Sequence, residues 1–187
     1  MKTINNYIVE KLNINKSNLK SGPEYTLFPK HHYELVRIIR NEINRNGNEC
    51  SLNHIDTSKI EDMSFLFSMD YNNGYKLHEF NGDISEWDVS NVKTMYAMFL
   101  NNKEFNNDIS EWNVSNVKDM RYMFKTSYFN GDISEWDVSK VQSTEYMFKD
   151  SKFNQNISNW KIKNNCDTNE MFDRCSIEDK YKPKCLQ

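Results

Sequence analysis

The stretch FNGDISEWDVSNV, residues 80–92, decides the fold because nearly the same letters return twice further along the chain. They come back as FNNDISEWNVSNV at 105–117 and as FNGDISEWDVSKV at 129–141, with a weaker copy, FNQNISNWKIKNN, at 153–165. Self-similarity at a fixed period of this length is typical of repeat architectures, in which one unit stacks on the next. The sequence therefore predicts an array of 24–25-residue units.

Large apolar residues recur at the same period in two further series. All four tryptophans belong to the first series: Trp87, Trp112, Trp136 and Trp160. The second follows a methionine in each unit and consists of Phe99, Phe124, Phe148 and Phe172. One unit cannot bury such residues alone, so we expect both series to form columns in a shared core. A divergent earlier unit at 52–67 brings the total to about five.

The apolar spacing changes within each unit. Trp87 and Val89 stand two residues apart, as in a strand, whereas Val92, Met95, Met98 and Phe99 follow at helical spacing, behind a serine suited to an N-cap. This pattern predicts an α/β stack of about five coils, each with one short parallel strand and one short helix.

The flanks predict caps for this stack. Residues 33–43 carry Leu35, Val36, Ile39 and Ile43 on one side of an expected helix, with Pro29 ahead of it and Asn46-Gly47 at its end. We therefore divide the chain into an N-terminal extension and helical cap (1–50), a repeat solenoid (51–177) and a tail (178–187). A further short helix around Tyr7, Ile8 and Leu12 is expected in the extension.

The pattern I84-x-x-W87-x-V89-x-x-V92-x-x-M95-x-x-M98-F99, followed by Phe105, resembles the BspA-like leucine-rich-repeat surface proteins. The version it resembles has 25-residue repeats and also occurs in mycoplasma-type lipoproteins; residues 29–67 and 171–184 are similar to that family's flanks. The resemblance implies a leucine-rich-repeat-like solenoid. It also suggests adhesion or protein binding at a cell surface, and it supplies no catalytic residues.

Composition narrows the classes of function. A formal charge of −3 lacks the basic footprint of a nucleic-acid binder, and no run of apolar residues is long enough for a membrane span. We find no secretory signal or lipid anchor, so a cytoplasmic location is the default and the cell surface is what the resemblance implies. The cysteines lack metal spacing and are expected to be free thiols, although a disulfide among Cys166, Cys175 and Cys185 stays open.

Acidic residues flank the tryptophans and form outward columns. The candidate partner-binding residues are Glu86, Asp88, Glu111, Asn113, Glu135 and Asp137. A third column at the coil corner holds Asp83, Asp108 and Asp132. One interpretation is an acidic concave strip that binds a basic partner. The other is that repetition merely copied these acids, and that the corner aspartates hydrogen-bond backbone N–H groups.

Three other kinds of site compete with these columns. The acids lack the spacing of a Ca²⁺-binding loop, and the tryptophans are expected in the core rather than on a carbohydrate-binding surface. Phe65, Tyr122 and Tyr146 form a separate aromatic column that is either half-exposed packing or a second contact patch.

No catalytic motif or cofactor fingerprint appears, so an enzyme is not expected. The sequence predicts a monomeric, non-catalytic protein-binding module with an unidentified protein partner, no cofactor and no metal. The alternatives are an adhesive or structural array that binds host protein or glycan, and an acidic mimic that occupies a nucleic-acid-binding partner.

Overall fold

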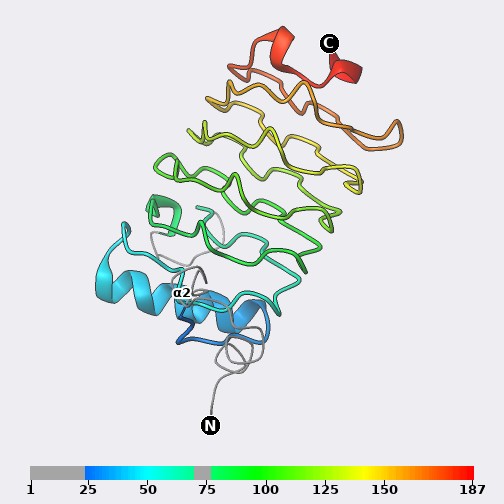
Figure 1. The fold of residues 1–187 in the computed structure, drawn as a ribbon. Helices are drawn as coiled ribbons and strands as arrows, with labels where there is room; N and C mark the ends of the chain where they lie inside the picture. Colours follow the sequence, from blue (N-terminus) through cyan, green and yellow to red (C-terminus); the bar gives the residue numbers. More distant parts are fainter. Residues whose placement is uncertain (1–23, 70–76) are drawn as a thin grey trace, which may run out of the picture.

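The computed structural model describes residues 24–69 and 77–187, and in it successive repeats are stacked one above another (Figure 1). Its helical elements are α2 (His32–Asn46) and three short 3₁₀ helices, η2 (Leu77–Glu79), η3 (Asp179–Tyr181) and η4 (Lys184–Leu186). We name the five repeats by their first residues, which are Leu52, Ile84, Ile109, Ile133 and Ile157. The helix expected around Tyr7 lies outside the described residues.

The α/β class predicted from the apolar spacing is wrong. Within 24–69 and 77–187 the repeats contain neither a strand nor an α-helix. What joins neighbouring repeats is a row of isolated parallel bridges at Asp62, Thr94, Asp119, Ser143 and Asp167, with one more bridge between Leu27 and Ile55. The repeats are therefore chains of turns and extended segments, and a leucine-rich-repeat-like solenoid with a strand and a helix per coil is not what forms.

On the tryptophan side of each repeat, local bonds occupy the groups that a strand ladder needs. The Trp87 N–H donates to the Ile84 carbonyl three residues earlier, at 3.2 Å, and thereby closes a turn. That same carbonyl also accepts the indole N–H of Trp112 from the next repeat, at 3.1 Å. A ladder requires successive backbone groups to face the neighbouring chain, and here they face their own turn or a side chain.

On the phenylalanine side, the methionine and phenylalanine spacing that predicted a helix belongs to overlapping turns. In the second repeat, Met98 donates to Met95, Leu100 to Ala97 and Asn102 to Phe99, each across three residues. A left-handed residue occurs at every fourth position of this segment. The residues concerned are Phe65, Ala97, Asn101, Tyr122, Thr126, Tyr146, Asp150, Glu170 and Arg174, with φ between 48° and 60°.

Bonds between repeats offset the strain of these left-handed residues, which is about 1–2 kcal/mol for each non-glycine residue. The N–H groups of Met95, Ala97, Phe99 and Asn101 donate to carbonyls of the third repeat, all at 2.9 Å. The same pattern recurs at each junction, always from the N–H of one repeat to the carbonyl of the next. We call this set of bonds the turn row.

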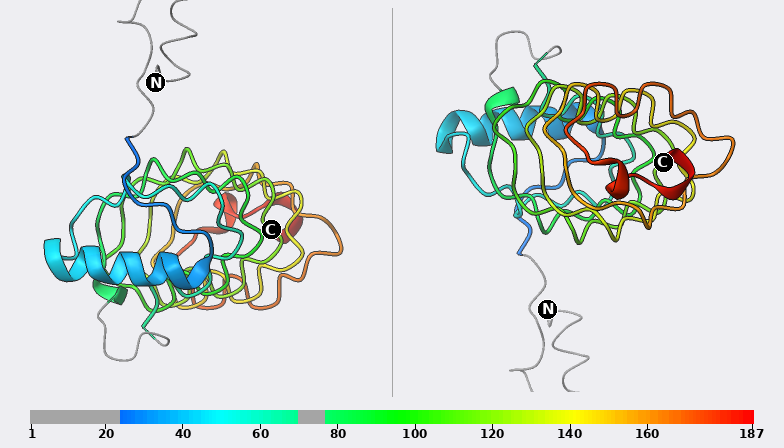
Figure 2. Two further views of the ribbon diagram at one scale, coloured as in Figure 1. Left: turned by 90° about the horizontal axis from the view of Figure 1, so that it is seen from below. Right: turned by 90° about the horizontal axis from the view of Figure 1, so that it is seen from above.

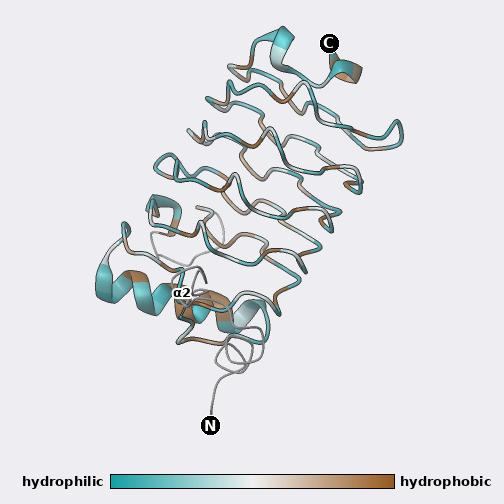
Figure 3. Ribbon diagram, viewed as in Figure 1, coloured by the Kyte–Doolittle hydropathy of each residue, from teal (hydrophilic) through white to brown (hydrophobic). Residues whose placement is uncertain are grey.

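The core consists of aromatic columns that run along the stack. Phe67, Phe99, Phe124, Phe148 and Phe172 stack with ring centroids 5.4–5.7 Å apart. A parallel column holds Phe80, Phe105, Phe129 and Phe153. All are buried except Phe172, which is half-buried in the last repeat. Apolar segments recur from repeat to repeat and along α2 (Figure 3).

The two ends of the stack are closed differently (Figure 2). At the N-terminal end, α2 buries Leu35, Ile39 and Ile43 and stops at Gly47, whose φ is 86° and whose N–H donates to Ile43. At the other end, the Ile157 N–H donates to the Tyr181 carbonyl at 2.9 Å, so the final segment lies against the fifth repeat. No helix among the described residues is long and apolar enough to cross a membrane.

Candidate functional site

The tryptophan column is the scaffold on which the candidate site is built. Its four side chains, Trp87, Trp112, Trp136 and Trp160, are at most 4 % exposed, and their rings stack 6.4–6.5 Å apart within 8° of parallel. Each indole N–H donates to a carbonyl of the preceding repeat, at 3.0–3.1 Å. Ring stacking and the indole hydrogen bond fix the position of each tryptophan. The residues immediately before and after it therefore recur at the same spacing from repeat to repeat.

A column of glutamates lies immediately before the tryptophans. Glu86, Glu111 and Glu135 are all exposed, and we call them the glutamate column. Their carboxylates make no hydrogen bond or ion pair with any residue in the described ranges. Two such charges about 6 Å apart repel by roughly 0.7 kcal/mol even in water. The unbound protein therefore carries a small electrostatic cost along this column.

The residues immediately after the tryptophans make local hydrogen bonds instead. They are Asp88, Asn113 and Asp137. Each side-chain oxygen accepts the N–H of the serine two residues later, at 3.0–3.2 Å. The spacing predicted these serines to be helix N-caps, but each instead donates its N–H to the side chain two residues earlier, and no helix follows it. The pKa of Asp137 is lowered by the Ser139 hydroxyl and N–H, and then by Lys140 and Lys161.

The corner aspartates Asp83, Asp108 and Asp132 make the backbone bonds expected of them. Each accepts the N–H of a serine two residues later, at 2.9–3.0 Å. Burial acts to raise the pKa of Asp83, but the two bonds from Ser85 and one from Asn53 outweigh it, so the pKa lies below its usual range. These aspartates hold the corners of the repeats together.

Two other candidate sites receive no geometric support. Among the residues that the structure describes, no three or more histidine, cysteine, aspartate or glutamate side chains gather as metal ligands. The buried tryptophans present no ring face to a sugar.

All four cysteines are free thiols: Cys50, Cys166, Cys175 and Cys185.

The aromatic column differs in membership from the one expected. Phe65, Tyr96, Tyr122 and Tyr146 form a continuous row with centroids 5.0–5.5 Å apart. Tyr96 was missed because its repeat has Ala97 at the position of the other aromatic residues, and the ring comes instead from the residue before it. Arg121 lies over the Tyr96 ring and Lys125 over the Tyr122 ring, so these aromatics pack partly against cations.

One family model matches the chain, and its description reads "Mycoplasma protein of unknown function, DUF285". It matches residues 39–150 and, in a second overlapping alignment, residues 68–182. Both alignments cover several repeats, and together they take in α2 from Ile39 onward. No curated protein and no solved structure matches the chain.

Proposed function

The chain belongs to the DUF285 family of Mycoplasma proteins of unknown function, and we propose that it is a non-catalytic module that binds a basic protein segment through the glutamate column. The observation that carries this proposal is the contrast in carboxylate bonding. Asp88 and Asp137 are engaged by serine N–H groups, whereas Glu86, Glu111 and Glu135 are exposed and have no partner in the described residues.

The spacing of the tryptophan rings beside the column is close to that of alternate side chains in an extended partner. An extended chain presents every second side chain about 6.8 Å apart. The tryptophans that hold the glutamates are 6.4–6.5 Å apart, ring to ring. A segment with lysine or arginine at alternate positions would therefore meet successive glutamates and relieve their mutual repulsion. Such exposed charges mainly accelerate encounter and select the partner, rather than supplying most of the affinity.

The alternative functions have less support from the geometry. A glycan-binding array needs exposed aromatic rings, and the tryptophans are buried. A nucleic-acid mimic needs a continuous acidic strip, whereas Asn113 interrupts the column beside the tryptophans and Lys161 ends it. We therefore keep a basic protein segment as the proposed ligand.

A peptide with lysine at every second position tests the proposal. We expect the native protein to bind it with an association rate that falls steeply as salt rises. The triple variant Glu86→Gln/Glu111→Gln/Glu135→Gln should associate more slowly and with a flatter salt dependence.

The matched control removes three other glutamates that have no side-chain bond or ion pair in the described residues. These are Glu61, Glu104 and Glu145, which lie outside the glutamate column. The control triple should bind almost as the native protein does. Equal weakening of the two triples would mean that only net charge matters, and the proposal would then be wrong. Failure of the native protein to bind the peptide would also refute it.

A further inference from the structure

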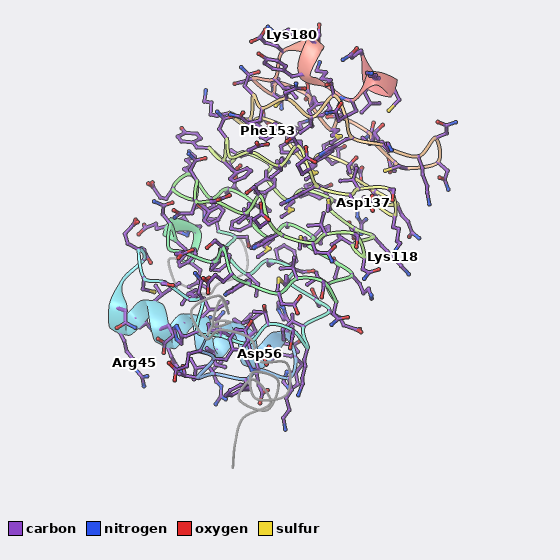
Figure 4. The ribbon with its side chains drawn as sticks, in the orientation of Figure 1. Arg45, Asp56, Lys118, Asp137, Phe153 and Lys180 are labelled. Carbon is purple, nitrogen blue, oxygen red and sulfur yellow. The ribbon has the colours of Figure 1, made fainter. Side chains whose placement is uncertain are left out.

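Three lysines from successive repeats line one pocket at the edge of the stack, next to the bridge row. Lys118, Lys140 and Lys163 surround a cavity of about 510 Å³ together with Val141, Gln142 and Asn165. Figure 4 shows Lys118 on the same edge as Asp137. We call this cavity the lysine pocket. It contains no member of the glutamate column.

Backbone bonds between repeats fix the wall of the lysine pocket. The Lys118 N–H donates to the Lys93 carbonyl at 2.8 Å, and Gln142 donates to Lys118 at 2.8 Å. Asp167 then donates to Gln142 at 2.9 Å. The pocket residues at these positions therefore keep their relative places through the stack, and only the lysine side chains need to adjust to a ligand.

Lys140 replaces the asparagine found at the same position of the second and third repeats. The two preceding repeats have Asn91 and Asn116 at this position, and each amide donates to a serine carbonyl of the repeat before it, at 2.8 and 2.9 Å. Lys140 instead reaches back to the neutral Asn116 side chain, at 2.9 Å. Because the asparagine side chain is neutral, this bond does not compensate the lysine charge, and it uses only one of the three ammonium N–H donors.

The lining of the pocket offers positive charge and hydrogen-bond donors without a carboxylate. None of the three lysines forms an ion pair with any residue in the described ranges, and the amides of Gln142 and Asn165 add neutral donors. Asp137 faces Lys140 and Lys161 from outside the lining, and its Oδ1 accepts the Ser139 N–H.

We propose that the lysine pocket binds a phosphate or sulfate ester. A tetrahedral anion accepts several hydrogen bonds at once, and lysine ammonium groups act as adjustable point charges toward such ligands. The ligand would relieve the repulsion among the three lysines and would link three consecutive repeats. Because it binds the folded stack, it should also raise the melting temperature.

Calorimetric titration of the full chain with inorganic pyrophosphate, as a probe for the phosphate group, and separately with a sulfated disaccharide, distinguishes phosphate from sulfate ligands. We expect saturable binding of one ligand per chain. Saturation by pyrophosphate alone assigns a phosphate site, and saturation by the disaccharide alone assigns a sulfate site. Saturation by both assigns a general site for either ester. Binding of neither ligand would overturn the proposal.

Single substitutions locate the site. Lys118→Gln, Lys163→Gln and Lys140→Asn should each weaken binding about fivefold, the upper range for one exposed charge pair. Lys140→Asn restores the residue of the two preceding repeats, so its melting temperature should stay near that of the native protein. Lys152→Gln removes the same charge from an exposed lysine outside the pocket and should leave binding unchanged. Equal effects of Lys140→Asn and Lys152→Gln would overturn the proposal.

A final variant separates this site from the glutamate column. Asp137→Asn should tighten binding about twofold, because it removes the acid that faces Lys140 while keeping the oxygen that Ser139 needs, as Asn113 does one repeat earlier. The glutamate-column triple should not weaken pyrophosphate binding. Loss of binding in that triple would contradict the assignment to the lysine pocket.

Discussion

The tryptophan and glutamate columns occupy adjacent positions of the same repeats, yet they differ in burial, in ring stacking and in side-chain hydrogen bonding. Trp112 is buried, lies between two parallel indole rings and donates to the Ile84 carbonyl. Glu111, one residue earlier, is exposed and has no side-chain partner in the described residues. Repetition at one period therefore does not imply equal structural constraint. The inward column holds the stack together, whereas the glutamates of the outward column are held by no side-chain bond in the described residues.

The largest expected effect is that of Trp112→Ala, which removes a ring stacked on both sides and leaves a cavity. We expect it to lower the free energy of unfolding by about 3–5 kcal/mol. Trp160→Ala should cost less, because Trp160 has a tryptophan on one side only and lies in the last repeat, which can open locally. Urea unfolding measures both. Equal shifts of the two midpoints would show that the columns do not act as a continuous stack.

A corner aspartate should give an intermediate effect. Asp132→Ala removes the acceptor for the Ser134 N–H and should cost about 0.5–1.5 kcal/mol, the usual contribution of one hydrogen bond. Asp132→Asn keeps an oxygen that can accept this N–H and should cost much less. Asn156, at the next corner, accepts the Ser158 N–H in the same way. Thermal melts of the two variants compare them. A similar loss for both would mean that the carboxylate charge matters rather than the bond.

The glutamate-column triple should change stability least among these substitutions. Replacing Glu86, Glu111 and Glu135 by glutamine removes repulsion between neighbouring charges and breaks no bond that the structure describes. We expect the free energy of unfolding to stay the same or to rise by up to about 1 kcal/mol. If urea unfolding showed the free energy of unfolding to fall by several kcal/mol, these glutamates would stabilise the stack as the tryptophans do.

The smallest expected effect is a change in the pKa of Asp83. This pKa is lowered in the folded protein because the Ser85 and Asn53 bonds outweigh the effect of burial. A depressed carboxyl pKa contributes stability above the unfolded value of about 3.9, and this contribution is lost as pH falls through the folded pKa. Ser85→Ala removes the 2.7 Å hydroxyl bond and should raise the Asp83 pKa in an NMR titration. An unchanged pKa would mean that the remaining bonds suffice.

The repeat period, the inward columns and α2 could all be read from the sequence, because large apolar residues must be buried and recur visibly. The backbone class could not be read in the same way. Met95, Met98 and Phe99 have the same spacing in overlapping turns as in a helix, and the left-handed residues Ala97 and Thr126 are not glycines that would signal such turns. The strand spacing around Trp87 was equally ambiguous.

The candidate sites were visible to different extents. The acidic columns follow directly from letters that repeat, but their division into bonded aspartates and unbonded glutamates depends on side-chain length. An aspartate oxygen reaches the N–H two residues ahead, whereas the longer glutamate extends into solvent. The lysine pocket gave no sequence signal, because its lysines occupy different positions in three successive repeats and only stacking brings them together.

The uniform direction of the turn row bears on how such a protein can change its length. Each repeat donates to the one after it and accepts from the one before it, with the same four positions at every junction in the interior of the stack. A duplicated unit inserted between two repeats would meet the same donors and acceptors that its neighbours already use. Gene segments that encode whole units can therefore be gained or lost without new interfaces, whereas a partial unit would put these groups out of register.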